Sequence, residues 1–88
     1  MGCMDLREGL RRQLHTVEEL LALSAETIRH QDLRIRCLEF GGHLDVAETA
    51  RRLRQRFVKT HALYVVRRYK LLIELARSNK EEGRNPPA

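Results

Sequence analysis

Histidines are the side chains of this chain that could bind a metal ion, because imidazole groups on facing helices form metal sites in helical bundles. Such sites place Glu three residues before His, so that both groups point inward. Arg, Thr, Phe and Val occupy those positions here, and the histidines are scattered along the sequence. We therefore expect no metal ion and no other cofactor. The four histidines are His15, His30, His43 and His61.

A serine and a histidine could act as nucleophile and base if the chain folds back so that Ser24 meets His61. No third residue is in place to orient the histidine, and a thin helical structure offers no pocket that excludes water. Glu18 and Glu19 are adjacent carboxylates, but neighbours on a helix point about 100° apart. We interpret them as ion-pair partners of basic residues. We expect no catalytic residues and a protein that is not an enzyme.

The strongest functional signal is a basic cluster in the second half of the chain. Residues 46–77 include nine Arg and Lys against two Glu, whereas residues 5–40 include six Arg against seven Asp and Glu. A basic helix face can lie along a nucleic-acid backbone and neutralise phosphates without reading sequence. No aromatic residue interleaves with the arginines for stacking on single strands, so the alternative is a solvated, partly ion-paired face. The candidate contacts are Arg52, Arg56, Lys59 and Lys70.

Helices must position these side chains, because apolar residues recur at spacings of three, four and seven on both sides of a glycine pair. The spacing predicts helices over about residues 6–40 and 46–78, each preceded by an aspartate, Asp5 or Asp45, that can cap its start. Gly41 or Gly42 can adopt the left-handed conformation that ends a helix. The apolar residues are Leu10, Leu14, Val17, Leu21, Ile28, Ile35 and Leu38, then Val46, Ala50, Leu53, Phe57, Tyr64, Leu71 and Leu75.

The pattern as a whole predicts an all-α protein with a single domain, residues 1–78, folded as an antiparallel two-helix hairpin that resembles a coiled coil. Residues 79–88 have no apolar periodicity and include Pro86 and Pro87, which predicts a disordered C-terminal tail. A turn at Gly42 also sets which residues face each other. The expected pairs are Ile35 with Ala50, Ile28 with Phe57, Leu21 with Tyr64, Leu14 with Leu71, Glu18 with Arg67, and Ser24 with His61.

The second helix has another apolar stripe, turned roughly 100° from the side that faces the first helix. One partner helix cannot cover both sides, and an exposed apolar face marks an interaction surface. A chain of 88 residues buries only about two-thirds or less of the surface that its unfolded form exposes, so association would add burial that it lacks. We therefore predict a homodimer that forms a four-helix bundle with the second helix at its centre. The stripe consists of Val58, Ala62, Val65, Tyr69, Leu72 and Ala76.

The cysteines and the hydropathy pattern predict a cytoplasmic protein. Cys3 and Cys37 lack the spacing of a zinc or redox pair, and the sequence contains no apolar run typical of a membrane span or a signal peptide. The opening Met-Gly-Cys leaves N-terminal acylation as an alternative, although Leu6 stands where that signal has Ser or Thr. We expect no membrane partner.

Residues 24–76 resemble a set of short helical proteins of alphaproteobacteria such as rhizobia. In those proteins a first helix ends in Leu-Glu, the turn contains Gly-His, and the second helix includes Phe-x-x-Thr-x-Ala-Leu before Arg-x-x-Leu-Leu-x-Glu-Leu. The resemblance implies a bacterial, cytoplasmic helical hairpin and adds no activity or catalytic residue. The matching residues are Leu38-Glu39, Gly42-His43, Phe57, Thr60, Ala62-Leu63, Arg68, Leu71-Leu72 and Glu74-Leu75.

The sequence thus predicts a non-enzymatic interaction module. We expect a scaffold or regulatory protein that associates with itself through the second helix and binds a further, unidentified protein. The alternative is a helical hairpin that binds nucleic acid through the basic face of the second helix.

Overall fold

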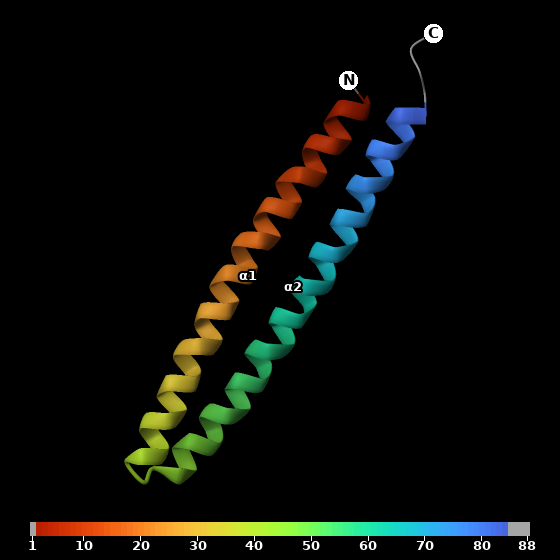
Figure 1. The fold of residues 1–88 in the computed structure, drawn as a ribbon. Coiled ribbons are helices and arrows are strands. Elements are labelled where there is room, and N and C mark those ends of the chain that lie inside the picture. Colours follow the sequence, from red (N-terminus) through yellow and green to blue (C-terminus); the bar gives the residue numbers. More distant parts are fainter. Residues whose placement is uncertain (1, 85–88) are drawn as a thin grey trace.

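The chain folds into a long helical hairpin, seen in a computed structural model that describes the backbone of residues 2–84 and the side chains of residues 6–80. In this range it consists of α1 (Gly2–Phe40) and α2 (Leu44–Arg84). The two helices run antiparallel and are joined by a short turn, as Figure 1 shows. The molecule is a rod that measures 72 × 15 × 14 Å. The predicted all-helical hairpin is confirmed.

Both helices begin earlier than predicted, so neither aspartate occupies the capping position. Asp5 lies inside α1, and Asp45 lies in the first turn of α2, where a carboxylate favours the positive end of the helix dipole. The residue that caps α2 is His43, whose carbonyl accepts a hydrogen bond of 2.9 Å from the backbone N–H of Ala47. The prediction of both N-caps was wrong by a few residues.

The second helix also ends later than predicted. It continues to Arg84, past the predicted end at residue 78, and residues 85–88 lie outside the described part. The disorder expected for residues 79–88 stays a prediction. The Asn79 side-chain oxygen accepts a hydrogen bond from Nη2 of Arg7 on α1, which ties this last part of the helix to its neighbour. Lys and Glu at residues 80–82 are also good helix formers.

A glycine turn reverses the chain between the helices. Gly42 has a φ of +78°, the left-handed conformation that was predicted for one of the two glycines. Its N–H donates to the carbonyl of Glu39 over 3.1 Å, and the N–H of His43 donates to the carbonyl of Leu38 over 2.9 Å. These are the two bonds of a Schellman motif, which satisfies the carbonyls left free at the end of α1.

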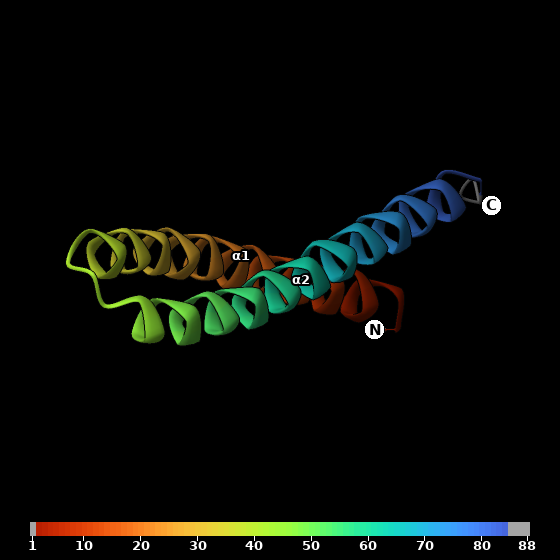
Figure 2. The same ribbon diagram turned by 90° about the horizontal axis from the view of Figure 1, so that it is seen from below.

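The apolar faces of the two helices meet along one seam. One buried apolar cluster lies in the half of the hairpin away from the turn, where Leu10, Val17 and Leu71 are buried. Near the turn, Ile35, Ala47 and Ala50 are buried. Figure 2 shows that the helices cross near the middle of the rod, which keeps residues at three-four spacing facing each other along a long contact. The residues packed against the open-end cluster are Leu14, Leu21, Tyr64 and Leu75.

Two residues that were expected in the seam lie outside it. Val46 and Leu53 are exposed, and the fully buried residue near the start of α2 is Ala47. The helix starts two residues earlier than predicted and meets α1 through Ala47 and Ala50, so Val46 and Leu53 point to one side of the contact. A rotation of one residue corresponds to about 100° around a helix, which is enough to expose them.

We predict opposite effects for the same change at two glycines. Gly42→Ala should lower the free energy of unfolding by about 1–2 kcal/mol, because alanine is strained at a φ of +78°. Gly9→Ala should raise it by up to about 1 kcal/mol, because Gly9 lies inside α1 and a Cβ there meets nothing within 4 Å. Urea denaturation followed by circular dichroism at one protein concentration measures both. Equal effects at the two positions would contradict the assigned turn.

Candidate interaction surfaces

A serine and a histidine face each other in the middle of the seam. Ser24 Oγ on α1 lies 2.5 Å from Nδ1 of His61 on α2, as the predicted register requires. The Ser24 hydroxyl also donates to the carbonyl of Leu21 over 3.1 Å. Both side chains are half-buried. The predicted register is therefore confirmed at this layer.

The hydrogen bonds of this pair suit a structural contact better than a nucleophile. A serine hydroxyl has one proton, and when it is donated to the Leu21 carbonyl the oxygen becomes the acceptor for an N–H at Nδ1 of His61. A general base must instead accept the proton of the serine. In residues 6–80, no carboxylate within hydrogen-bond distance orients His61. The pair can hold the register of the two helices.

Ion pairs flank the seam on one side. Nε of Arg68 lies 3.1 Å from Oε2 of Glu18, whereas Arg67 donates to Oε1 of Gln13 over 2.8 Å. The predicted pair of Glu18 with Arg67 is therefore wrong by one residue, because the α2 face that meets this edge of α1 contains Arg68. The expectation that Glu18 pairs with a basic residue of the second helix is confirmed. Glu19 instead lies 2.6 Å from His15 on its own helix.

Two further polar contacts in the seam were not predicted. Arg54 reaches Asp32 across the helices, with 2.5 Å between Nε and Oδ1. Gln31 is buried, with 6% of its surface exposed, and its Nε2 donates to the carbonyl of Ala50 over 2.9 Å. The signal for Gln31 was present in the sequence, since it lies three and four residues from Ile28 and Ile35 at the seam spacing.

We predict that Gln31→Leu stabilises the hairpin by about 1 kcal/mol. Loss of the side-chain hydrogen bond costs about 0.5–1.5 kcal/mol, whereas burial of a leucine gains about 1.5–3 kcal/mol. The Ala50 carbonyl keeps its bond within α2. The free energy of unfolding measures the change, and Gln55→Leu is the matched control because Gln55 is exposed. A large loss of stability specific to Gln31→Leu would contradict this explanation.

The histidines lie apart from one another. His15 pairs with Glu19, His30 lies 3.8 Å from Glu26, and His43 lies in the turn. Among the described residues, no three His, Cys, Asp or Glu side chains gather closely enough to hold a metal ion. His15 and His30 therefore make separate contacts with glutamates on the surface of α1.

The basic residues predicted to bind nucleic acid lie on the outer side of α2. Arg52 is highly exposed and its Nε lies 3.7 Å from Oε1 of Glu48. Arg56, Lys59 and Lys70 are exposed, and within residues 6–80 none of the three forms an ion pair. Arginines nearer the seam are matched by carboxylates, as in the pair of Arg51 Nη1 with Glu39 Oε2 at 2.6 Å. The unmatched positive charge is thus concentrated on the face opposite α1.

The second apolar stripe of α2 is exposed along its whole length. The exposed fraction is 39% for Val58, 49% for Val65 and 38% for Leu72, and Tyr69 is more exposed still. Ala62 and Ala76 are also exposed. We call these six predicted residues the α2 stripe. In this hairpin α1 covers only the seam, so the α2 stripe is left open to solvent.

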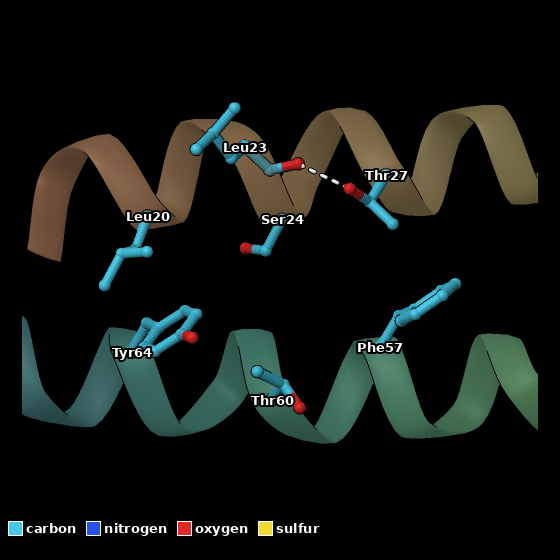
Figure 3. A pocket seen from close by; sticks show the side chains of 7 residues that line it. All are labelled: Leu20, Leu23, Ser24, Thr27, Phe57, Thr60 and Tyr64. Atoms are coloured by element: carbon cyan, nitrogen blue, oxygen red, sulfur yellow. Dashed lines mark hydrogen bonds between the residues drawn. The ribbon is translucent and has the colours of Figure 1, made fainter.

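An apolar groove of about 330 Å³ lies between the helices near the Ser24 layer, and the sequence did not predict it. Thr60 and Val58 leave α2 about 200° apart, so the groove and the α2 stripe lie on different sides of the rod. Figure 3 shows the side chains from both helices that line it, and the Thr27 hydroxyl donates to the Leu23 carbonyl over 2.9 Å. The lining residues are Leu20, Leu23, Ser24, Thr27, Phe57, Thr60 and Tyr64.

Comparisons with protein-family models, with curated proteins and with solved structures found no match to this chain. The resemblance to short alphaproteobacterial proteins therefore stays a prediction. Within residues 2–84, neither helix contains a stretch apolar enough to cross a membrane.

Proposed function

We propose that this protein is a non-enzymatic interaction module that forms a homodimer through the α2 stripe. Two hairpins would pack as a four-helix bundle with α2 at its centre, and the bundle would act as a scaffold or regulator for a further protein. The observation that supports this proposal is the exposed α2 stripe, which continues for nearly five turns with apolar residues at three-four spacing.

Burial of the α2 stripe would contribute more to the free energy of dimerisation than the weak polar contacts around it. A Val or Leu side chain contributes about 1.5–3 kcal/mol when it passes from full exposure to full burial. Val58, Val65 and Leu72 are already partly covered, so each would contribute a fraction of that amount. In a symmetric dimer each of these residues is buried in both copies, so its contribution to the free energy of association is doubled. The same residues exposed on a monomer would be an open apolar strip on a highly charged protein.

We predict that the double substitution Val65→Glu and Leu72→Glu dissociates the dimer and leaves a helical monomer. Four carboxylates would be placed in an apolar contact, which should raise the dissociation constant at least about a thousandfold. Size-exclusion chromatography with light scattering at tens of micromolar gives the mass, and circular dichroism gives the helix content.

Leu53→Glu with Leu63→Glu is the matched control. These residues are exposed on α2 outside the α2 stripe, so the control adds the same charge and should leave the mass unchanged. A wild-type protein that is monomeric at this concentration would contradict the proposal. So would a stripe variant that stays dimeric.

The second candidate function is binding of nucleic acid by the outer face of α2. The supporting observation is the exposed, unmatched charge of Arg56, Lys59 and Lys70. Phosphate contacts of this kind would be independent of sequence and would weaken steeply with salt. This face and the α2 stripe both belong to α2, so the two functions could coexist in one dimer.

We predict that Arg56→Glu with Lys59→Glu abolishes any gel shift that the wild-type protein gives with duplex DNA at low salt. The affinity of the wild type should fall with salt at a logarithmic slope of about −0.9 per phosphate contact. Arg29→Glu with Arg34→Glu on α1 is the control of equal charge. Absence of a shift by the wild type at low salt would rule out this second function.

A further inference from the structure

The arrangement of two copies can be derived from the residues beside the α2 stripe, and this inference rests on the homodimer proposed above. We infer that the α2 stripe is covered by a second copy whose rod runs in the opposite direction. In this arrangement α2 packs on α2 and α1 packs on α1, around a two-fold axis perpendicular to the rods.

One edge of α1 belongs to the same face of the rod as the α2 stripe. Arg54 and Arg68 reach Asp32 and Glu18 on this edge. Val58 lies four residues after Arg54, as Leu72 does after Arg68, so both lie over the same side of α2. The interaction face therefore includes the part of α1 around Ala25, midway between Glu18 and Asp32.

The middle of this α1 edge is a hollow. A depression of about 330 Å³ is lined by Ala22, Ala25, Glu26 and Arg29. Small side chains allow two helices to approach closely. If Ala22 meets Ala22 of the second copy, the two-fold axis passes through this hollow beside Ala22 and Ala25, and Glu26 and Arg29 complete its lining.

The same axis must cross α2 at the matching level. The contact of Ser24 with His61 sets α1 and α2 level with each other, so Ala22 lies level with about residue 63 of α2. An axis there brings Ala62 to the second copy's Val65 and Val58 to the second copy's Tyr69. The centre of the contact on α2 is thus apolar on both sides.

Charges on α1 are complementary in this register. Along antiparallel α1 helices that cross at Ala22, Glu8 lies next to the second copy's Arg36, and Arg11 lies next to the second copy's Asp32. Symmetry repeats each contact, which gives four pairs of opposite charge. Among the described residues Arg36 forms no ion pair, and Glu8 pairs with Arg12 of its own helix over 3.5 Å, where both side chains stay exposed and Glu8 can also reach a second copy.

The other closed arrangement would put charged groups on apolar ones. A two-fold axis parallel to the rods would lay α1 over the second copy's α2 at the same level. Arg29 would then lie on the second copy's Val58, and Arg36 would lie near the second copy's Arg51. Burial of a charge on apolar side chains is costly and two arginines brought together repel each other, so the antiparallel arrangement is favoured.

A charge-exchange experiment tests the register. Glu8→Arg alone and Arg36→Glu alone should each raise the dissociation constant of the dimer about tenfold, because two attractive pairs become repulsive. An equimolar mixture of the two variants should form a heterodimer of wild-type affinity, since all contacts between positions 8 and 36 are again of opposite charge. Analytical ultracentrifugation and native mass spectrometry measure the affinity and the composition.

The control replaces Arg34, which lies outside the interaction face. Arg34→Glu mixed with Glu8→Arg should give no restored heterodimer. Restoration by Arg36→Glu but not by Arg34→Glu supports the inference. The inference is overturned if neither Glu8→Arg nor Arg36→Glu weakens the dimer. It is also overturned if Arg34→Glu restores the heterodimer with Glu8→Arg as well as Arg36→Glu does.

A distance measurement tests the direction of the rods independently. A Cys3→Ser variant keeps only Cys37, which is exposed near the turn and accepts a spin label. The antiparallel dimer places the two labelled residues about 45 Å apart along the rod, because each lies about 15 residues from the axis. The alternative arrangement places them within about 25 Å, roughly two helix diameters.

Electron–electron dipolar spectroscopy on the labelled dimer distinguishes these values. A separation near 45 Å supports the antiparallel arrangement. A dimer with the short separation overturns this inference and leaves the homodimer of the proposed function intact. A monomer in solution overturns both.

Discussion

The apolar contact between α1 and α2 determines where every other side chain of this rod can lie. Isolated helices are marginal in water, and packing of one face against a neighbour supplies most of their stability. Here each helix has a single neighbour, and no large side chain among the described residues is completely buried. Most of each helix surface therefore remains outside the contact. Among the described residues, exposed helix surface thus exceeds buried core.

Polar layers give this contact its register. An apolar seam alone tolerates slippage by a heptad, because Leu, Val and Ile can replace one another. The Ser24–His61 contact, the Gln31 bond to Ala50 and the Arg54–Asp32 pair each have one correct partner. Any shift would leave half-buried polar groups without partners, which costs more than an imperfect apolar contact. The same layers fix the levels of the two helices, on which the inferred antiparallel dimer rests.

The three-four spacing and the glycine pair were enough to predict the hairpin, its turn and the Ser24–His61 layer. They were not enough to predict which residue of an adjacent pair enters the seam. Ala47 is buried in place of Val46, and Arg68 reaches Glu18 in place of Arg67, because both outcomes depend on where α2 starts and how it is rotated. The α2 stripe could be recognised from spacing alone, and the residues do lie exposed. The groove beside Phe57 could not be recognised from spacing, because its shape depends on how the side chains of both helices are oriented in the folded hairpin.

The open-end cluster of Leu10, Val17 and Leu71 has a consequence for the way the rod comes apart. Helical hairpins ordinarily lose structure first where the chain ends, because terminal turns have few neighbours. Here a buried cluster lies in the half of the rod away from the turn, and the bond from Arg7 to Asn79 lies beyond it. Figure 1 shows the start of α1 and the end of α2 at that same end of the rod. These contacts hold the terminal halves of the two helices together, so we expect them to fray less than helix ends that lack such neighbours.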